Sequence, residues 1–137
     1  MTTIYILGHG RSLTEMRNSP LIKKQYALKT QNATVVYIDR DPAVSPDLCF
    51  DVCTTWPSDS ASVDTVIDTV GYENYIFFSN STFLSELKRV LKPGGEYIGY
   101  AKVERVADAF LQLEKQFKTV STFQNVPIGM IGIKLTN

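Results

Sequence analysis

The chain has 137 residues, of which 44% are hydrophobic, so it is long enough for one domain with a sizeable core and too short for two. We therefore expect a single domain over residues 1–137. Fourteen basic and fourteen acidic side chains cancel to a formal net charge of zero, which argues against bulk electrostatic attraction to nucleic acid or to an anionic membrane.

The first half of the chain alternates apolar runs with turn residues, as parallel α/β proteins do. The run Ile4–Leu7 predicts a buried first strand, which Gly8-His9-Gly10 ends in a tight turn. Ser19 as an N-cap and Pro20 as the first helical residue predict a helix over residues 20–29. Three more strands follow, at residues 34–39, 48–52 and 63–68.

A strongly amphipathic helix opens the second half. Its apolar residues recur at helical spacing and its last turn is basic, where the helix dipole favours cations. The apolar residues are Phe83, Leu84, Leu87, Val90 and Leu91, and the basic ones are Lys88, Arg89 and Lys92. We expect Pro93-Gly94-Gly95 to end this helix. A strand over 96–101, a helix over 103–118 and an antiparallel hairpin of strands 121–126 and 128–135 complete the chain.

The segment Leu91-Lys92-Pro93-Gly94-Gly95, followed at once by a short aromatic and β-branched run, resembles the fifth-strand region of class I S-adenosylmethionine-dependent methyltransferases. The order of the predicted elements also matches that family from Ile4 to Leu135. The resemblance implies an α/β fold with a three-layer, Rossmann-like sheet that is mostly parallel and ends in an antiparallel hairpin. It also implies S-adenosylmethionine as the cofactor and a methyltransferase that acts on an unidentified small-molecule or macromolecular acceptor.

Open α/β sheets bind their ligands at the carboxyl ends of the strands, near the point where strand order reverses. The turn Gly8-His9-Gly10 follows the first strand there, and its glycines let a ligand approach the backbone because they have no Cβ. Asp39 ends the second strand and can accept hydrogen bonds from both ribose hydroxyls of a nucleoside. The resemblance places the side chain of Asp51 and the backbone N–H of Val52 at the adenine edge.

In a methyltransferase, the carboxyl end of the fourth strand would face the transferred methyl group. Asp68 and Tyr72 are the catalytic candidates there, with Asp68 as a proton acceptor or an orienting group that also borders the cofactor. Two of the cofactor-site acids have simpler interpretations as well. Asp39 and Asp51 could each cap a turn made by the residues that follow them.

Two positions differ from the family pattern, because Ile6 stands where an acidic residue usually helps to hold the methionine amino group, and Ser12 stands at the third glycine. A second hypothesis is therefore a catalytically inactive methyltransferase-like domain that serves as a binding or scaffolding module. Trp56 and an aromatic cluster would form its contact surface if they were exposed together. The cluster comprises Tyr72, Tyr75, Phe77 and Phe78, of which the last two could instead pack beneath the next helix. A neighbouring copy in a homo-oligomer could complete the open site.

Cys49 and Cys53 are the only cysteines, and they lie four residues apart in a chain without a secretory signal or a long apolar segment. This pattern favours a reduced, cytoplasmic protein over one with a disulfide framework, and we expect no membrane association. With His9 as the single histidine, the residues that could bind a metal do not match a four-ligand zinc site, so we expect no metal.

Overall fold

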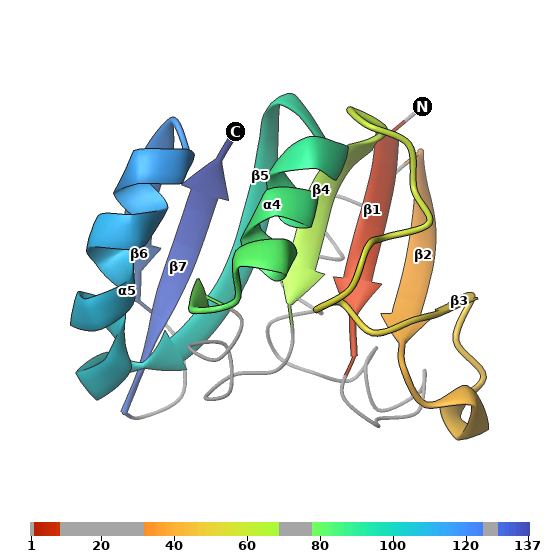
Figure 1. Cartoon of the computed structure of the whole chain (residues 1–137), viewed down its shortest axis with the longest axis horizontal. Coiled ribbons are helices and arrows are strands. Elements are labelled where there is room, and N and C mark those ends of the chain that lie inside the picture. The colour runs from red at the N-terminus through yellow and green to blue at the C-terminus, as the bar shows by residue number, and fades with distance from the viewer. Residues whose placement is uncertain (1, 9–31, 69–77, 125–128) are drawn as a thin grey trace.

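Seven strands form one mixed sheet in the parts of the chain that the structure, a computed structural model, describes: residues 2–8, 32–68, 78–124 and 129–137 (Figure 1). Their order across the sheet is β3-β2-β1-β4-β5-β7-β6. The strands are β1 (Thr2–Leu7), β2 (Ala33–Asp39), β3 (Leu48–Cys49), β4 (Val63–Asp68), β5 (Leu91–Lys102), β6 (Thr119–Phe123) and β7 (Met130–Thr136). The sequence predicts all of them in this chain order.

The strand directions also follow the prediction. β1 pairs in parallel with β2 and with β4, and β3 and β5 extend the parallel part on its two sides. β7 inserts antiparallel between β5 and β6, which makes the expected hairpin. Strand order reverses between β1 and β4, since the chain builds outward from β1 to β3 and then restarts at β4. The carboxyl ends of β1 and β4 therefore flank the position at which open α/β sheets bind ligands.

The described helices include α4 (Ser81–Val90) and α5 (Val103–Gln116), which lie on the same face of the sheet (Figure 1), and a short 3-10 helix, η1 (Pro42–Val44), which follows β2. α4 begins after Asn80, whose side-chain oxygen accepts a 2.9 Å hydrogen bond from the N–H of Phe83. Neither α4 nor α5 has the length and hydropathy that crossing a bilayer requires. The predicted helix over 20–29 lies outside the described residues.

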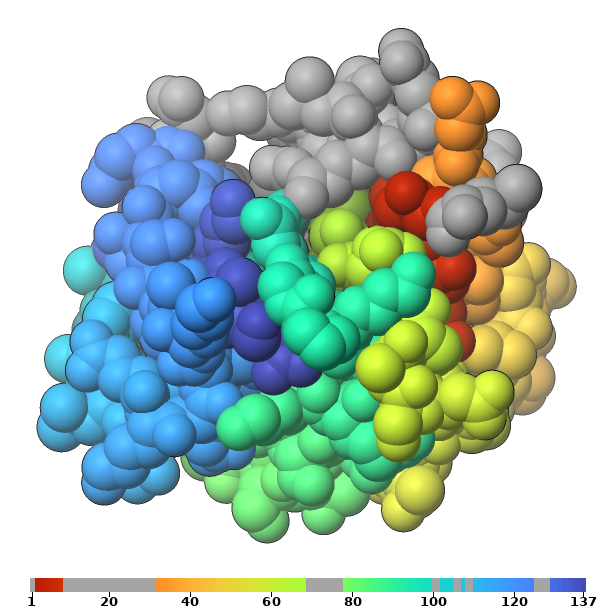
Figure 2. Space-filling model, turned by 90° about the horizontal axis from the view of Figure 1, so that it is seen from above, coloured from red at the N-terminus to blue at the C-terminus, as the bar shows by residue number. Residues whose placement is uncertain are grey.

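The predicted end of the first of these helices, at Pro93–Gly95, is too late. α4 ends at Val90, and β5 already begins at Leu91. The side-chain amide of Asn137 holds this junction, because it donates hydrogen bonds of 3.0 and 2.9 Å to the carbonyls of Lys88 and Leu91. Figure 2 shows the start of β5, in teal, beside the dark blue C-terminal strand. A contact between residues far apart in sequence therefore sets this boundary.

β3 is shorter than predicted because the chain turns at Asp51. The carboxylate of Asp51 accepts a 2.9 Å hydrogen bond from the N–H of Cys53, and its carbonyl accepts bonds from the N–H and the hydroxyl of Thr54. Residues 50–62 then cross the face of the sheet that carries α4 without forming a helix (Figure 1). This stretch brings Trp56 against Phe83 of α4, with ring centroids 6.1 Å apart.

The core lies on both faces of the sheet, since successive strand residues alternate between them. The cluster on the α4 side includes Leu7, Ile38 and Val66, and the opposite face carries Ile4, Ile6, Tyr37 and Ile67. By the same alternation, Asp39 faces the side of Tyr37, whereas Asp68 faces the side of α4.

Candidate functional site

Gly8, Tyr37 and Asp39 meet at the carboxyl ends of β1 and β2. The N–H of Gly8 donates a 2.8 Å hydrogen bond to the carbonyl of Ile38, which places Gly8 beside Asp39. A Cβ at position 8 would lie 2.6 Å from the hydroxyl oxygen of Tyr37 and 2.9 Å from Oδ2 of Asp39. The missing side chain of Gly8 therefore makes room for the Tyr37 ring, a packing role that the interpretation of Gly8 as a ligand-facing glycine does not include.

Asp39 is 2% exposed, and neighbouring groups bind both of its side-chain oxygens. Oδ1 accepts a 2.9 Å hydrogen bond from the N–H of Asp41, and the hydroxyl of Tyr37 donates to Oδ2 at 3.4 Å. The turn-capping interpretation of Asp39 is thus confirmed for Oδ1.

Asp51 and Val52 lie one strand further along the same edge. The N–H of Phe50 donates a 3.1 Å hydrogen bond to the carbonyl of Asp39, so Asp51 directly follows the paired ends of β2 and β3. The carboxylate of Asp51 caps its own turn, as the simpler interpretation predicts, and the residue is exposed. Val52 is buried, and none of the described groups accepts a hydrogen bond from its N–H.

Asp68 ends β4 beside this edge, but its side chain lies in the core. It pairs in register with Leu7, the residue before Gly8. Neither Asp68 nor Tyr97 is exposed to solvent, and the hydroxyl of Tyr97 donates a 2.6 Å hydrogen bond to Oδ2 of Asp68. Burial, then the charge of Asp68 and this hydrogen bond, raise the pKa of Tyr97 well above its usual value. Tyr97 therefore stays protonated and holds the Asp68 carboxylate as a donor.

The structure thus brings Gly8, Asp39 and Asp51 to one edge of the sheet, with Asp68 on the neighbouring strand. Because Asp39 and Asp68 face opposite sides of the sheet, their carboxylates do not converge on a single atom. The remaining predicted site residues, His9, Gly10 and Tyr72, lie outside the described residues.

The hypothesis that Trp56 and Phe78 belong to an exposed contact surface is wrong, because each side chain is only 2% exposed. Trp56 packs on Phe50 and Phe83, with ring centroids 5.7 and 6.1 Å apart. Phe78 packs edge-on against Tyr97 at 5.9 Å, so it is a core residue, as the alternative interpretation predicts. Tyr72, Tyr75 and Phe77 of the same predicted cluster lie outside the described residues.

Of the described residues, those at this edge fit the nucleoside half of S-adenosylmethionine better than its methionine half. Asp39 and Asp51 are carboxylate acceptors, which suit the hydroxyl and amino donors of adenosine. Ile6 is 3% exposed and packs with Ile4 and Tyr37, so the position of the expected acid belongs to the apolar core. An isoleucine neither accepts a hydrogen bond nor offsets the charge of an amino group.

No group of three or more metal-binding side chains occurs within residues 2–8, 32–68, 78–124 and 129–137. Cys49 and Cys53 are both free thiols. Burial, followed by the charge of Asp51, raises the pKa of Cys53, and the nearby charge of Arg40 opposes this shift only in part. Cys53 is therefore protonated at neutral pH and a weak nucleophile.

Sequence reasoning overlooks Tyr37 and Tyr97 as site residues and misplaces Trp56. A signal was available, because a buried Tyr or Trp normally needs a hydrogen-bond partner for its polar atom. Tyr37 and Asp39 are two residues apart on one strand, so they share a face of the sheet. The partner of Tyr97 is different, since Asp68 lies on another strand and only the fold brings it near.

No family model and no curated protein matches the sequence. Solved structures, in contrast, match nearly the whole chain. A SAM-dependent methyltransferase from Aquifex aeolicus has a TM-score of 0.66 at 16% identity, over 98% of this chain and 81% of its own. A TehB-like SAM-dependent methyltransferase from Corynebacterium glutamicum has a TM-score of 0.60 at 14% identity, over 97% and 79%. A probable spermidine synthase from the same species has a TM-score of 0.68 at 16% identity, over 98% and 56%.

These similarities are of fold, and they include proteins with different named activities. They agree with the strand order, the parallel pairing of β1 with β2 and β4, and the antiparallel insertion of β7. The same architecture is implied by the segment Leu91–Gly95 and by the order of the predicted elements. The chain therefore has the fold of the class I S-adenosylmethionine-dependent methyltransferases.

Proposed function

We propose that the chain binds S-adenosylmethionine at the carboxyl edge of β1, β2 and β3 and transfers its methyl group to an acceptor. The observation that carries this proposal is the approach of Gly8, Asp39 and Asp51 to one edge, beside the reversal of strand order, in a fold shared with methyltransferases. The acceptor is a small molecule or a macromolecule with a nucleophilic atom.

Each residue at the edge has a distinct role in this proposal. Asp39 accepts hydrogen bonds from the ribose hydroxyls, and Asp51 accepts one from the amino group of adenine. The N–H of Val52 donates to the adenine ring. We propose that Gly8, His9 and Gly10 contact the methionine part. S-adenosylmethionine supplies a methyl group on a positively charged sulfur, and the chain orients both reactants and excludes water.

Asp68 and Tyr72 border the methyl-transfer end in this proposal. Because Asp68 is closed to solvent and bonded to Tyr97, we assign it an orienting role at the end of β4 and not that of a solvent-facing base. Tyr72 is the polar group proposed to contact the acceptor.

Calorimetric titration of S-adenosylmethionine and S-adenosylhomocysteine into three proteins tests the cofactor site. The proteins are the natural chain, Asp39→Ala, and Asp59→Ala as a control that removes an exposed acid. We expect both ligands to bind the natural chain and the control, and Asp39→Ala to bind neither. No binding to the natural chain at millimolar concentration, or equal binding to Asp39→Ala, would overturn the proposal.

A catalytically inactive binding domain is the second candidate, and the apolar surroundings of Ile6 and the burial of Asp68 favour it. Methyl transfer from labelled S-adenosylmethionine to cell extract and small-molecule fractions separates the two. Labelled product that Asp39→Ala does not form supports the enzyme, whereas ligand binding without any transfer supports the binding domain.

Two further properties belong to this proposal. The free thiols of Cys49 and Cys53 suit a reducing compartment, so we place the reaction in the cytoplasm.

Val103 and Leu111 of α5 are 54% and 68% exposed, and a second copy of the chain would remove these apolar side chains from water. Sedimentation equilibrium of the natural chain and of Leu111→Glu tests this, since a dimer that the substitution dissociates is expected.

A further inference from the structure

Trp56 is the only tryptophan in the chain, and it contacts both the turn after β3 and helix α4. Its side chain is buried and packs against Phe50 and against Phe83 of α4. The indole N–H donates a 2.9 Å hydrogen bond to the carbonyl of Val52. The indole therefore binds the backbone of the turn that carries Asp51.

This hydrogen bond fixes one end of the peptide unit between Val52 and Cys53. The other end is fixed as well, because the N–H of Cys53 donates a 2.9 Å hydrogen bond to Oδ1 of Asp51. A peptide unit is planar, so holding its carbonyl and its N–H sets the orientation of the whole unit. The direction of the Asp51 carboxylate, whose Oδ1 accepts the bond from Cys53, then depends on the position of the Trp56 indole.

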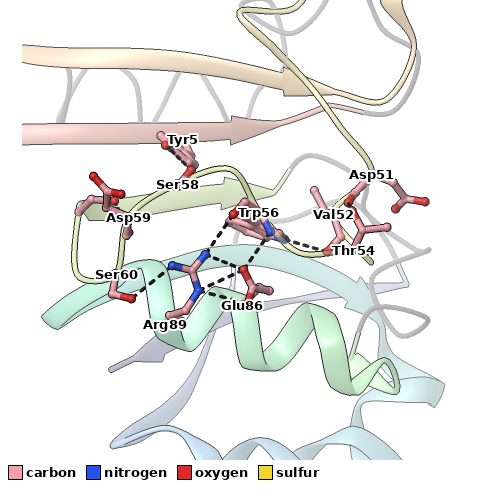
Figure 3. A network of polar contacts seen from close by, with 11 residues as sticks. Tyr5, Asp51, Val52, Thr54, Trp56, Ser58, Asp59, Ser60, Glu86 and Arg89 are labelled. Carbon is pink, nitrogen blue, oxygen red and sulfur yellow. Dashed lines mark hydrogen bonds and ion pairs between the residues drawn. The ribbon is translucent and has the colours of Figure 1, made fainter.

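The backbone of Trp56 is held in turn by an ion pair on α4 (Figure 3). Its N–H donates a 2.9 Å hydrogen bond to Oε2 of Glu86, and its carbonyl accepts one of 3.1 Å from Nη2 of Arg89. Nη2 of Arg89 also lies 2.6 Å from Oε2 of Glu86. Both polar groups of the Trp56 backbone are therefore bonded to one charged pair, which gives the loop a rigid anchor.

Figure 3 also shows that the Asp51 side chain points away from this network. The network ends at the turn that presents Asp51 and Val52 at the carboxyl edge of the sheet. We propose that Trp56, anchored by Glu86 and Arg89, is a positioning residue that orients the Asp51 carboxylate toward the adenine of a bound nucleoside. This inference rests on the proposed function for the identity of the ligand.

A positioning role makes a prediction about base selectivity that a purely structural role does not. A site that hydrogen-bonds a ligand's amino group rejects an analogue that lacks the group, because its own polar atoms are then left unpaired. Hypoxanthine has an oxygen where adenine has the amino group. Misorienting the Asp51 carboxylate should therefore weaken the discrimination between the two bases, whereas general loosening of the fold should weaken both complexes equally.

The experiment compares Trp56→Phe with Tyr5→Phe by calorimetry, using S-adenosylhomocysteine and its inosine analogue. Tyr5→Phe is the matched control, because it removes the 2.7 Å hydrogen bond between Tyr5 and Ser58 in the same loop without touching Val52. We expect the natural chain and Tyr5→Phe to prefer the adenine ligand by about tenfold or more, and Trp56→Phe to lose most of that preference. Equal weakening of both ligands in Trp56→Phe would overturn the proposal.

Amide hydrogen exchange supplies a readout that needs no ligand. In Trp56→Phe we expect the N–H groups of Cys53 and Thr54 to exchange about tenfold faster, with no change in Tyr5→Phe. Unchanged exchange would overturn the positioning role whatever the ligand. If the natural chain binds neither nucleoside, the proposed function fails, and the assignment of the ligand as adenine fails with it. Faster amide exchange in Trp56→Phe would still establish that Trp56 stabilises the turn. If Trp56→Phe does not fold, Glu86→Gln takes its place, with smaller changes expected in the same direction.

Discussion

The hydroxyl of Tyr97 donates a 2.6 Å hydrogen bond to Oδ2 of Asp68, with both side chains closed to solvent. Tyr97→Phe keeps the ring but removes the donor from a buried carboxylate, so the free energy of unfolding should fall by about 2 kcal/mol in urea titrations. Because the two residues share one bond, Tyr97→Phe combined with Asp68→Asn should cost less than the sum of the single variants. Additive costs would show that the bond contributes nothing.

Ionised Glu86 should stabilise the fold at neutral pH, and this contribution should be lost in acid. The hydrogen bond from Arg89 lowers the pKa of Glu86, burial opposes this shift, and the N–H of Trp56 lowers it further. A carboxyl whose folded pKa is below its unfolded value, about 4.3, stabilises the fold above that pH and loses the contribution as pH falls through the folded pKa. Glu86→Gln should thus cost about 1–2 kcal/mol at pH 7 and much less at pH 3.

Urea unfolding at both pH values measures this difference. Glu114→Gln is the matched control, because it neutralises an exposed acid of α5. A cost of Glu86→Gln that stays constant from pH 7 to pH 3 would contradict the assignment of this ion pair.

Gly8→Ala tests the contact between Gly8 and Tyr37. The added Cβ would lie 2.6 Å from the hydroxyl oxygen and 2.7 Å from Cε2 of Tyr37, which forces the ring to shift. We expect a loss of about 1–3 kcal/mol in unfolding free energy, as for other overpacked positions. Tyr37→Leu in the same chain should recover part of this loss, and a Gly8→Ala variant as stable as the natural chain would contradict the packing.

Asn137→Ala should loosen the junction between α4 and β5. The variant removes the donor of two hydrogen bonds, to the carbonyls of Lys88 and Leu91, and should cost about 1 kcal/mol or somewhat more. Thermal unfolding measures the loss, with Gln124→Ala as an exposed control. An unchanged midpoint would show that the amide does not cap the helix.

The sheet could be predicted because its signals are local. Apolar runs such as Ile4–Leu7 and Val63–Asp68 mark buried strands, and the second of these is predicted with the bounds that the structure has. The acids Asp39 and Asp51 could also be placed at one edge, because the carboxyl ends of parallel strands lie together.

The internal contacts of the site could not be predicted, since they depend on partners distant in sequence. The sequence places Trp56 in a loop, but it does not indicate that Glu86, 30 residues later, binds the Trp56 backbone. The sequence predicts Asp68 as a proton acceptor or an orienting group at the carboxyl end of the fourth strand, but not its bond from Tyr97, which the pairing of β4 with β5 brings near. Local sequence patterns contain neither relationship.

The proposed site requires that a glycine and two carboxylates, which follow or end three adjacent strands, together bind one nucleoside. Titration with S-adenosylhomocysteine, followed by mapping of ¹⁵N–¹H chemical-shift changes, measures whether they do. We expect the largest changes at the amides of Gly8, Asp39 and Val52, and no change at those of Gly94 and Asn137, which lie at the opposite edge. Changes confined to that opposite edge, or none at millimolar ligand, would contradict it.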